Sequence, residues 1–356
     1  MRLLASLGAI ALLVLTVSAQ APLEIYFIDT EGGQATLLVT PAKESVLIDA
    51  GYGPRAGRGT IPPVSAARDP ERILDAAREA GISRIDYLVI THFHPDHAGG
   101  VPELAKRIPI GTFVDYGEPL GTPYGPDRMA GNTFANYLPI RNAGKYMMAR
   151  PGDVLPLKGV DARVVSSAGG HLLRPLEGGG DTNSACTGLE EHPEDGTENF
   201  RSVGLMFRYG AFKFLDLGDL SGMTLTRLAC PKNMLGTVSV LLTPHHGDYD
   251  GYVPALYAAI KPRVIVMNNG TTHGGSPMIR EIARTQPGVE DLWQLHLSML
   301  KDAENADEAF IANLDDGRTT GFGLKLTADS DGSFTVTNSR NAHTKTYART
   351  GANRTR

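Results

Sequence analysis

Three histidines and an aspartate fall within six residues, in the run His92-Phe93-His94-Pro95-Asp96-His97. This run directly follows residues 85–90, which have the apolar pattern of a buried strand. Imidazole nitrogen and carboxylate oxygen together suit zinc. His92 and His94 stand at alternate positions and can face one ion, while Asp96 and His97 turn towards a second. We therefore predict a metal site with room for two adjacent ions.

Other polar residues follow other predicted strands, and in chain order they are Asp49, Asp219, His245, His246, Asn269 and His273. The strands before them are predicted for residues 45–48, 212–216, 238–242 and 264–267. Side chains at the ends of neighbouring strands meet at one edge of a sheet. We therefore expect these residues to gather near the first histidine run.

The same patterns predict most of the remaining elements. Further strands are predicted for residues 23–29, 35–39, 85–90 and 202–209, and a closing hairpin for residues 323–327 and 333–338. A helix is predicted over residues 71–80, with Asp69 as its N-cap, Pro70 as its first residue and Gly81 after its end. Residues 110–200 show little periodicity and many Gly, Pro, Asn and Asp residues, so we predict loops with short elements there.

Two stretches of the chain resemble each other weakly. Residues 46–51 read VLIDAG and residues 214–219 read FLDLGD, and each precedes a helix, a strand and a loop with histidines. Such duplicated halves pack as two sheets between outer helices. The predicted fold class is therefore α/β, a four-layer αββα sandwich of two mixed β-sheets with the metal site along the shared edge.

Composition limits the classes of protein to be considered. The chain has 356 residues, of which 42% are hydrophobic and 21% charged, as expected for one large globular domain or two small ones. Its 34 Lys and Arg residues against 39 Asp and Glu residues give a net charge of −5, which argues against an extended nucleic-acid footprint. The sequence does not indicate an oligomeric state.

The N-terminus predicts export. Residues 3–17 are apolar, Arg2 precedes them, and the small residues of the segment 18–21 allow cleavage after Ala19 or Ala21. This run is shorter than the ~20 residues that span a bilayer, so no stable membrane span is expected after cleavage. We predict a signal peptide at residues 1–21, one folded domain at 22–348, a polar tail at 349–356, and a periplasmic or extracellular location.

The two cysteines agree with export. Cys186 and Cys230 can form one disulfide in an oxidising compartment, and two buried free thiols are the alternative. Both lie outside the histidine run, so neither is needed as a metal ligand.

The chain resembles the metallo-β-lactamase-fold superfamily, whose HxHxDH motif stands here as His92, His94, Asp96 and His97. Residues 48–51 resemble its first motif, Gly218-Asp219 its bridging carboxylate, and His245-His246-Gly247 its last metal histidine. The resemblance covers residues 23 to 275. Within the superfamily, residues 27–36 and 244–247 are most similar to the branch that includes the soluble domain of the ComEC DNA-uptake protein and phosphorylcholine esterase.

The resemblance implies two divalent metal ions, with zinc expected and manganese or iron as alternatives. The implied metal ligands are His92, His94, Asp96, His97, Asp219 and His246. His245 would contact substrate or donate a proton to the leaving group, unless the roles of His245 and His246 are reversed. Asp49 is expected to accept an imidazole N–H and fix the ring. Asn269 and His273 lie in a loop that either contacts the substrate or is plain surface.

One motif departs from the superfamily pattern. Many lactamases and lactonases have a Gly-His-Thr motif where residues 196–202 read GTENFRS, so a third histidine for the first metal is missing. The Asn-x-x-Ser pattern that begins at Asn199 is similar to the ComEC-like branch, and Asn199 is expected to support the metal ligands or to contact the substrate. The first metal is therefore expected to keep His92, His94 and Asp219 plus waters. His171 and His192 are the nearby substitutes, and we interpret both as surface-loop residues.

Two adjacent ions bridged by Asp219 would hold a water and lower its pKa towards roughly 7, which generates hydroxide at neutral pH. The predicted catalytic residues are thus Asp96, Asp219 and His245. A net charge of about +1 at the centre favours an anionic small-molecule substrate, and we predict hydrolysis of a phosphodiester-type ester. Hydrolysis of a cyclic ester or amide, as in lactonases and β-lactamases, is the first alternative, and a non-catalytic metal-containing binding module is the second.

Overall fold

Two β-sheets form the centre of the molecule in a computed structural model that describes residues 21–54, 65, 67–120, 127–189, 196–315 and 321–349. The first sheet contains β1 (Leu23–Phe27), β2 (Thr36–Val39), β3 (Ser45–Ile48), β4 (Ile85–Val89), β5 (Ile110–Asp115), β6 (Lys145–Met148), β16 (Leu324–Ala328), β17 (Phe334–Asn338) and β18 (Thr344–Tyr347). The second contains β7 (Val154–Leu155), β8 (Asp161–Ser167), β9 (Gly170–His171), β10 (Gly204–Tyr209), β11 (Phe212–Asp216), β12 (Val240–Leu242), β13 (Val264–Met267), β14 (Asp291–His296) and β15 (Ile311–Asn313).

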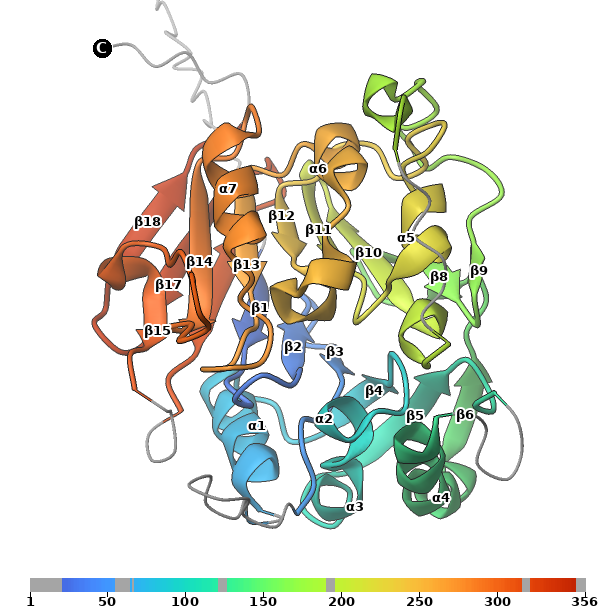
Figure 1. The fold of residues 1–356 in the computed structure, drawn as a ribbon. Helices are drawn as coiled ribbons and strands as arrows, with labels where there is room; N and C mark the ends of the chain where they lie inside the picture. The colour runs from blue at the N-terminus through green and yellow to red at the C-terminus, as the bar shows by residue number, and fades with distance from the viewer. Residues whose placement is uncertain are drawn as a thin grey trace, which may run out of the picture.

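Helices cover the outer faces of both sheets (Figure 1). On the first sheet they are α1 (Arg68–Glu79), α2 (Pro95–Ala98), α3 (Val101–Leu104) and α4 (Arg128–Asn142), and on the second α5 (Gly222–Arg227), α6 (Pro254–Ile260) and α7 (Pro277–Thr285). Each sheet has antiparallel strands followed by parallel ones, from β3 to β6 in the first and from β11 to β15 in the second. The predicted αββα sandwich of two mixed sheets is confirmed.

Aromatic side chains fill the space between the sheets. Phe27 of β1 and Phe214 of β11 come from different sheets, and their ring centroids lie 5.7 Å apart. Trp293 is fully buried and donates its Nε1–H to the Tyr347 hydroxyl at 2.9 Å. The only tryptophan of the chain is therefore a core residue, because its ring is enclosed and its N–H is satisfied.

Two predicted elements were wrong. The segment 110–200 was predicted as loops with short elements, but it forms the long helix α4 and the seven-residue strand β8. The buried residues Ala130, Phe134, Tyr137 and Arg141 of α4 repeat every three or four positions, so packing of this face outweighs the poor helix formers Gly131 and Pro139. The cap of α1 was also misplaced, because the helix begins at Arg68 and its N-cap is Ala67, not Asp69.

Cys186 and Cys230 form a disulfide with a Cα–Cα distance of 5.7 Å, which confirms the predicted bridge. The predicted signal peptide lies outside the described residues apart from Ala21, and the polar tail lies outside them apart from Arg349. Within the described part of the chain, no helix combines the length and the apolar character needed to cross a membrane.

Asp29 and His296 form a buried ion pair that joins the two sheets. Asp29 follows β1, His296 ends β14, and the His296 Nε2 to Asp29 Oδ1 distance is 2.5 Å. Arg72 of α1 adds a contact to the other carboxylate oxygen at 2.8 Å. The pair therefore ties together the strand ends near which the histidine loops lie.

This pair predicts a pH dependence of stability. Burial would lower the pKa of His296, but Asp29 raises it above its ordinary value of 6.5. Burial would raise the pKa of Asp29, but His296 and Arg72 hold it below 3.8. The stabilisation is therefore complete between pH 3.8 and 6.5, and it is lost as the pH rises through the raised pKa of His296 or falls through the lowered pKa of Asp29.

We expect His296→Gln to lower the free energy of unfolding by about 1–3 kcal/mol near pH 5.5, because it removes one charged partner from the buried Asp29 carboxylate, which keeps Arg72 as the other. Urea denaturation of chelator-treated protein at pH 5.5 and at pH 8.5 measures the effect. The difference from the wild-type chain should shrink at the higher pH, and His171→Gln should change neither value. A difference that does not vary with pH would contradict this assignment.

Candidate metal centre

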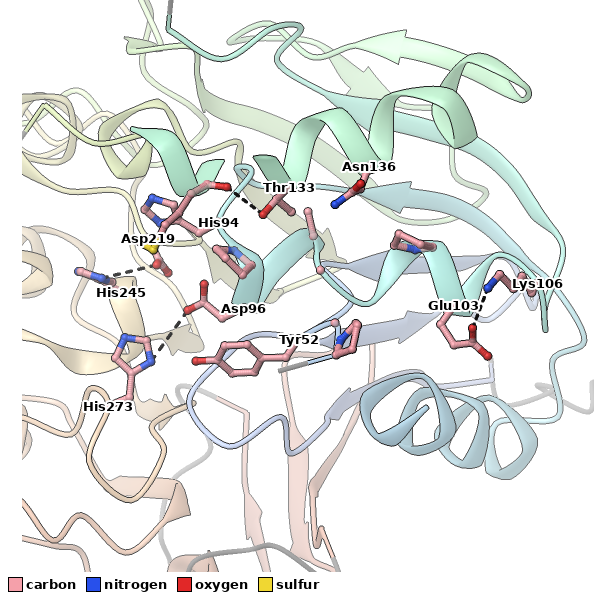
Figure 2. A pocket seen from close by; sticks show the side chains of 17 residues that line it. Tyr52, His94, Asp96, Glu103, Lys106, Thr133, Asn136, Asp219, His245 and His273 are labelled. Carbon is pink, nitrogen blue, oxygen red and sulfur yellow. Dashed lines mark hydrogen bonds and ion pairs between the residues drawn. The ribbon is translucent and has the colours of Figure 1, made fainter. Parts of the chain in front are cut away.

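A pocket of about 870 Å³ opens where the ends of the two sheets meet (Figure 2). His94, Asp96, Asp219, His245 and His273 line one end of it. They come from the loops and short helices after β4, β11, β12 and β13. The structure therefore brings residues that are far apart in sequence to one place, as the strand-end pattern predicts.

The first of two donor sets consists of His92, His94 and Asp219. His92 Nε2 lies 2.9 Å from His94 Nδ1 and 3.6 Å from Asp219 Oδ2. His92 stands just after β4, and His94 is the extended N-cap residue of α2. The two rings face each other through different nitrogens, Nε2 of His92 and Nδ1 of His94.

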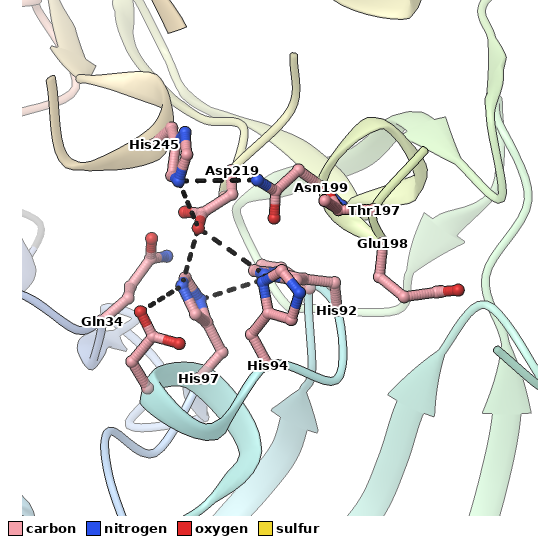
Figure 3. A network of polar contacts seen from close by, with 12 residues as sticks. Gln34, His92, His94, His97, Thr197, Glu198, Asn199, Asp219 and His245 are labelled. Atoms are coloured by element: carbon pink, nitrogen blue, oxygen red, sulfur yellow. Dashed lines mark hydrogen bonds and ion pairs between the residues drawn. The ribbon is translucent and has the colours of Figure 1, made fainter. Parts of the chain in front are cut away.

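The second donor set consists of Asp96, His97, Asp219 and His246, all of them buried. His97 Nε2 lies 3.2 Å from His246 Nε2 and 3.1 Å from Asp219 Oδ2. His246 Nε2 lies 3.3 Å from the other oxygen, Asp219 Oδ1, and 3.6 Å from Asp96 Oδ2. Asp219 therefore belongs to both sets and stands between them (Figure 3).

A left-handed turn presents the second histidine pair. His245, His246 and Gly247 have φ angles of 48°, 54° and 77°. Non-glycine residues rarely adopt this conformation, and it is retained mostly where function requires it. The turn directs His246 into the second donor set and leaves His245 at the pocket, with His245 Nε2 3.6 Å from Asp219 Oδ2. His245 Nδ1 contacts the Asp250 carboxylate.

Asp49 lies directly behind the second set. Its Oδ2 is 2.7 Å from His97 Nδ1, and its two oxygens also accept hydrogen bonds from the Thr91 backbone N–H at 2.8 Å and the Thr91 hydroxyl at 2.7 Å. This contact leaves His97 Nε2 free to face the donor set. The structure thus shows the expected acceptor geometry for Asp49.

The electrostatics of the cluster fit a cation. Burial would raise the pKa of Asp219, but His246, His97 and other surrounding imidazoles hold it well below its usual range. Burial would lower the pKa of His97, but Asp219, Asp49 and Asp96 raise it well above its ordinary value. Asp219 Oδ1 and His246 Nδ1 are also buried without a hydrogen-bond partner. Buried anionic oxygens beside imidazole nitrogens are a donor set that divalent cations satisfy.

Comparison with known proteins agrees with this geometry. The Metallo-beta-lactamase superfamily model matches residues 29–197. Residues 29–197, just under half of the chain, are therefore similar to the metallo-β-lactamase superfamily. Its members are metallohydrolases that bind divalent metals. No curated protein matches the sequence.

Solved structures to which the chain is similar are distant in sequence. The metallo-β-lactamase-fold protein YhfI from Bacillus subtilis is 10% identical with a TM-score of 0.44, covering 76% of this chain and 96% of its own. Igni18, a metallo hydrolase from Ignicoccus hospitalis, is 16% identical with a TM-score of 0.43, covering 80% and 97%. A diphosphatase of the PhnP family is 12% identical with a TM-score of 0.40, covering 86% and 98%.

Asp127 is a site residue that the sequence did not reveal. Its Oδ2 lies 2.5 Å from His94 Nε2, and its Oδ1 caps α4 through the Ala130 N–H at 3.1 Å. Asp127 Oδ2 also accepts a hydrogen bond from the Glu198 N–H at 3.3 Å. A carboxylate behind an imidazole fixes its tautomer and orientation. Recognising Asp127 as a helix cap would have required predicting α4.

We expect Asp127→Asn to weaken metal binding by about 10- to 100-fold, because the His94 ring loses the carboxylate that orients it. Asparagine is also a good N-cap, so the stability of α4 should be nearly unchanged. Calorimetric titration of chelator-treated protein with Zn²⁺ measures the affinity, and Asp75→Asn on the exposed face of α1 is the matched control. Equal affinities for both variants would show that Asp127 does not position His94.

The remaining predicted residues lie at different distances from the donor sets. His273 lines the pocket, and its Nδ1 is 3.9 Å from Asp96 Oδ2. Asn269 is fully buried and donates to the His296 and Gly270 carbonyls, so it shapes the loop and does not line the pocket. His171 belongs to β9 and to neither donor set, and His192 lies outside the described residues.

Proposed function

We propose that this chain is an exported hydrolase that uses two divalent cations, zinc in the first instance, to cleave a phosphoester of the phosphodiester type. The observation that carries the proposal is Asp219, which belongs to two donor sets at one end of a large pocket. Two divalent cations held by these residues would polarise a phosphoryl oxygen and would lower the pKa of a bound water. An anionic ester is the substrate class that such a cationic centre attracts.

The pocket indicates where the rest of the substrate lies. From the donor sets it runs along α4, past Met129 and Thr133 to Asn136, over roughly 10 Å of helix at about 1.5 Å per residue. Pro102 lines the pocket from α3. These four residues carry no charge, and the ion pair of Glu103 and Lys106 lines the end of the pocket away from the donor sets. A phosphodiester with one extended, uncharged substituent fits this shape.

Two pocket histidines are placed to act on the substrate. His245 presents Nε2 to the pocket, and its contact with Asp250 orients the ring. We assign to His245 a hydrogen bond to the substrate or donation of a proton to the leaving group. The ring of His273 lies next to that of His245, with centroids 6.4 Å apart, so we expect His273 to contact the same substrate (Figure 2). Substitution of His245 or of His273 tests each role.

The branch of the superfamily, the cellular location and the class of partner are part of the same proposal. We place the chain nearest the branch of the ComEC soluble domain and phosphorylcholine esterase, on the motifs of residues 27–36 and 244–247. Export is supported by the apolar N-terminal segment and by the Cys186–Cys230 disulfide, since disulfides persist in oxidising compartments. The partner is a small anionic molecule, and the net charge of −5 argues against nucleic acid.

Turnover on a small panel tests this function. The substrates are bis-p-nitrophenyl phosphate, p-nitrophenyl phosphate, p-nitrophenyl phosphorylcholine, a lactone and nitrocefin. We expect zinc-dependent turnover of a phosphodiester that His94→Ala abolishes and that the matched variant His171→Ala retains. Turnover of the lactone or nitrocefin alone would replace the proposal with hydrolysis of a cyclic substrate. Bound metal without turnover of any ester would favour a binding module.

A further inference from the structure

Asn199 lies in the segment 196–202, in which the superfamily pattern would place a third histidine for the first cation. The residue begins the short 3₁₀ helix Asn199–Arg201, and only 4% of it is exposed. Its Oδ1 is buried and has no hydrogen-bond partner. A buried amide oxygen without a partner lowers the stability of the fold, because the oxygen loses its hydration. Such an atom in a native structure therefore calls for an explanation, and binding a ligand is one.

The side chain is directed towards the first donor set. Asn199 Nδ2 faces His245, at 3.5 Å from its Nε2, and the Asn199 oxygen points towards the side of the site where His92 and His94 lie (Figure 3). The unpaired oxygen therefore faces the first donor set, which consists of His92, His94 and Asp219. Those three residues supply only three of the four donors that a tetrahedral cation requires.

The backbone around Asn199 is fixed to the same elements as the donors. The Glu198 N–H binds Asp127 Oδ2 at 3.3 Å, and this carboxylate also holds His94. The Val203 N–H donates to the Thr91 carbonyl at 2.9 Å, immediately before His92. The amide oxygen is therefore held in place by the contacts that orient the two imidazoles.

We propose that Asn199 Oδ1 is the fourth donor to the cation held by His92, His94 and Asp219. The inference rests on the metal centre of the proposed function and not on its substrate class. An amide oxygen is a harder ligand than an imidazole nitrogen, and carbonyl ligands suit Mn²⁺ whereas imidazole suits zinc. The first site thus discriminates less in favour of zinc than a site with three histidines.

Calorimetric titration of the chelator-treated protein with Zn²⁺, and separately with Mn²⁺, tests this donor. Asn199→Leu keeps the size of the side chain without its oxygen, and should weaken one of two binding steps by about tenfold or more while the other changes little. Asn199→Asp keeps an oxygen at the position and should bind both cations at least as tightly as the wild type. Asn199→His should strengthen Zn²⁺ binding more than Mn²⁺ binding. Asn132→Leu, on the exposed face of α4, is the matched control.

The visible spectrum of the Co²⁺-substituted protein gives a second readout that does not depend on turnover. Its ligand-field bands should change in Asn199→Leu and remain unchanged in Asn132→Leu. Unchanged affinities and spectra in Asn199→Leu, or equal weakening of both steps, would overturn the inference. If the expected binding pattern appears without ester turnover, the inference stands and the proposed function fails. A wild-type chain that binds no cation would overturn both.

Discussion

Replacing Asp219 with asparagine should remove activity and weaken both metal sites at once. Asp219 Oδ2 lies 3.1 Å from His97 Nε2 and Asp219 Oδ1 lies 3.3 Å from His246 Nε2, while His92 of the other set is also within 3.6 Å. Loss of this charge takes an anionic ligand from each site. We expect kcat to fall by at least about 100- to 1,000-fold, the loss typical when one electrostatic contact to a reacting centre is removed.

Asp216→Asn is the matched control for this change. Asp216 is buried three positions before Asp219, and burial together with Asp49 raises its pKa to about 7. Its Oδ1 accepts from Gln34 Nε2 and from the Gly218 N–H, both at 3.0 Å, and an asparagine oxygen can keep both bonds, whereas the bond from Gln34 Nε2 to Oδ2 is lost. Metal content by mass spectrometry and turnover should therefore stay near wild type. Equal losses of metal content and turnover in the two variants would contradict the role of Asp219 as a ligand shared by both donor sets.

Asp49→Ala should cause the largest loss of stability. The substitution leaves the Thr91 N–H, the Thr91 hydroxyl and His97 Nδ1 in a buried space without their acceptor. Removing one partner from a buried charged network costs about 3–5 kcal/mol. Asp49 also has a φ of 60°, which alanine adopts at a further cost. The measurement is urea denaturation of the chelator-treated protein.

Asp49→Asn separates the stability of this network from its effect on metal binding. Asparagine tolerates the left-handed backbone and can still accept from the Thr91 N–H. Its Nδ2 would face His97 Nδ1, and this nitrogen would then have to accept, which places the proton on Nε2. A protonated Nε2 cannot bind a cation. We expect the variant to be nearly as stable as the wild-type chain and to bind metal more weakly. An unchanged metal affinity would contradict the assigned role of Asp49.

The donor residues could be predicted because each of them follows a predicted strand. The spacing of His92, His94, Asp96 and His97 fixes which side chains share a face, and strand ends of a mixed sheet meet at one edge. For the same reason Asp219 and His246 were expected at that edge, and the structure places both there. The roles of these residues as ligands remain predictions.

The residues that support the donors were harder to predict because their contacts depend on tertiary packing. Asp127 caps a helix whose polar and helix-breaking residues obscure its periodicity, so its contact with His94 has no local signal. The contact of Asp250 with His245 depends on a left-handed turn that sequence patterns do not indicate. The sequence suggested that the Asn269 loop either contacts the substrate or is plain surface. Asn269 is instead buried, because its side chain donates to the His296 carbonyl of β14, and this contact has no local sequence signal.

The most direct test of the metal centre is a zinc titration of the chelator-treated protein, with bis-p-nitrophenyl phosphate turnover followed throughout. We predict no turnover without zinc, and a rate that rises to a plateau at about two equivalents per chain, as for a two-metal hydrolase. Asp219→Asn should stay flat over the same range. Turnover that survives chelation, or that is equal in Asp219→Asn, would contradict the claim that this cluster carries out the hydrolysis.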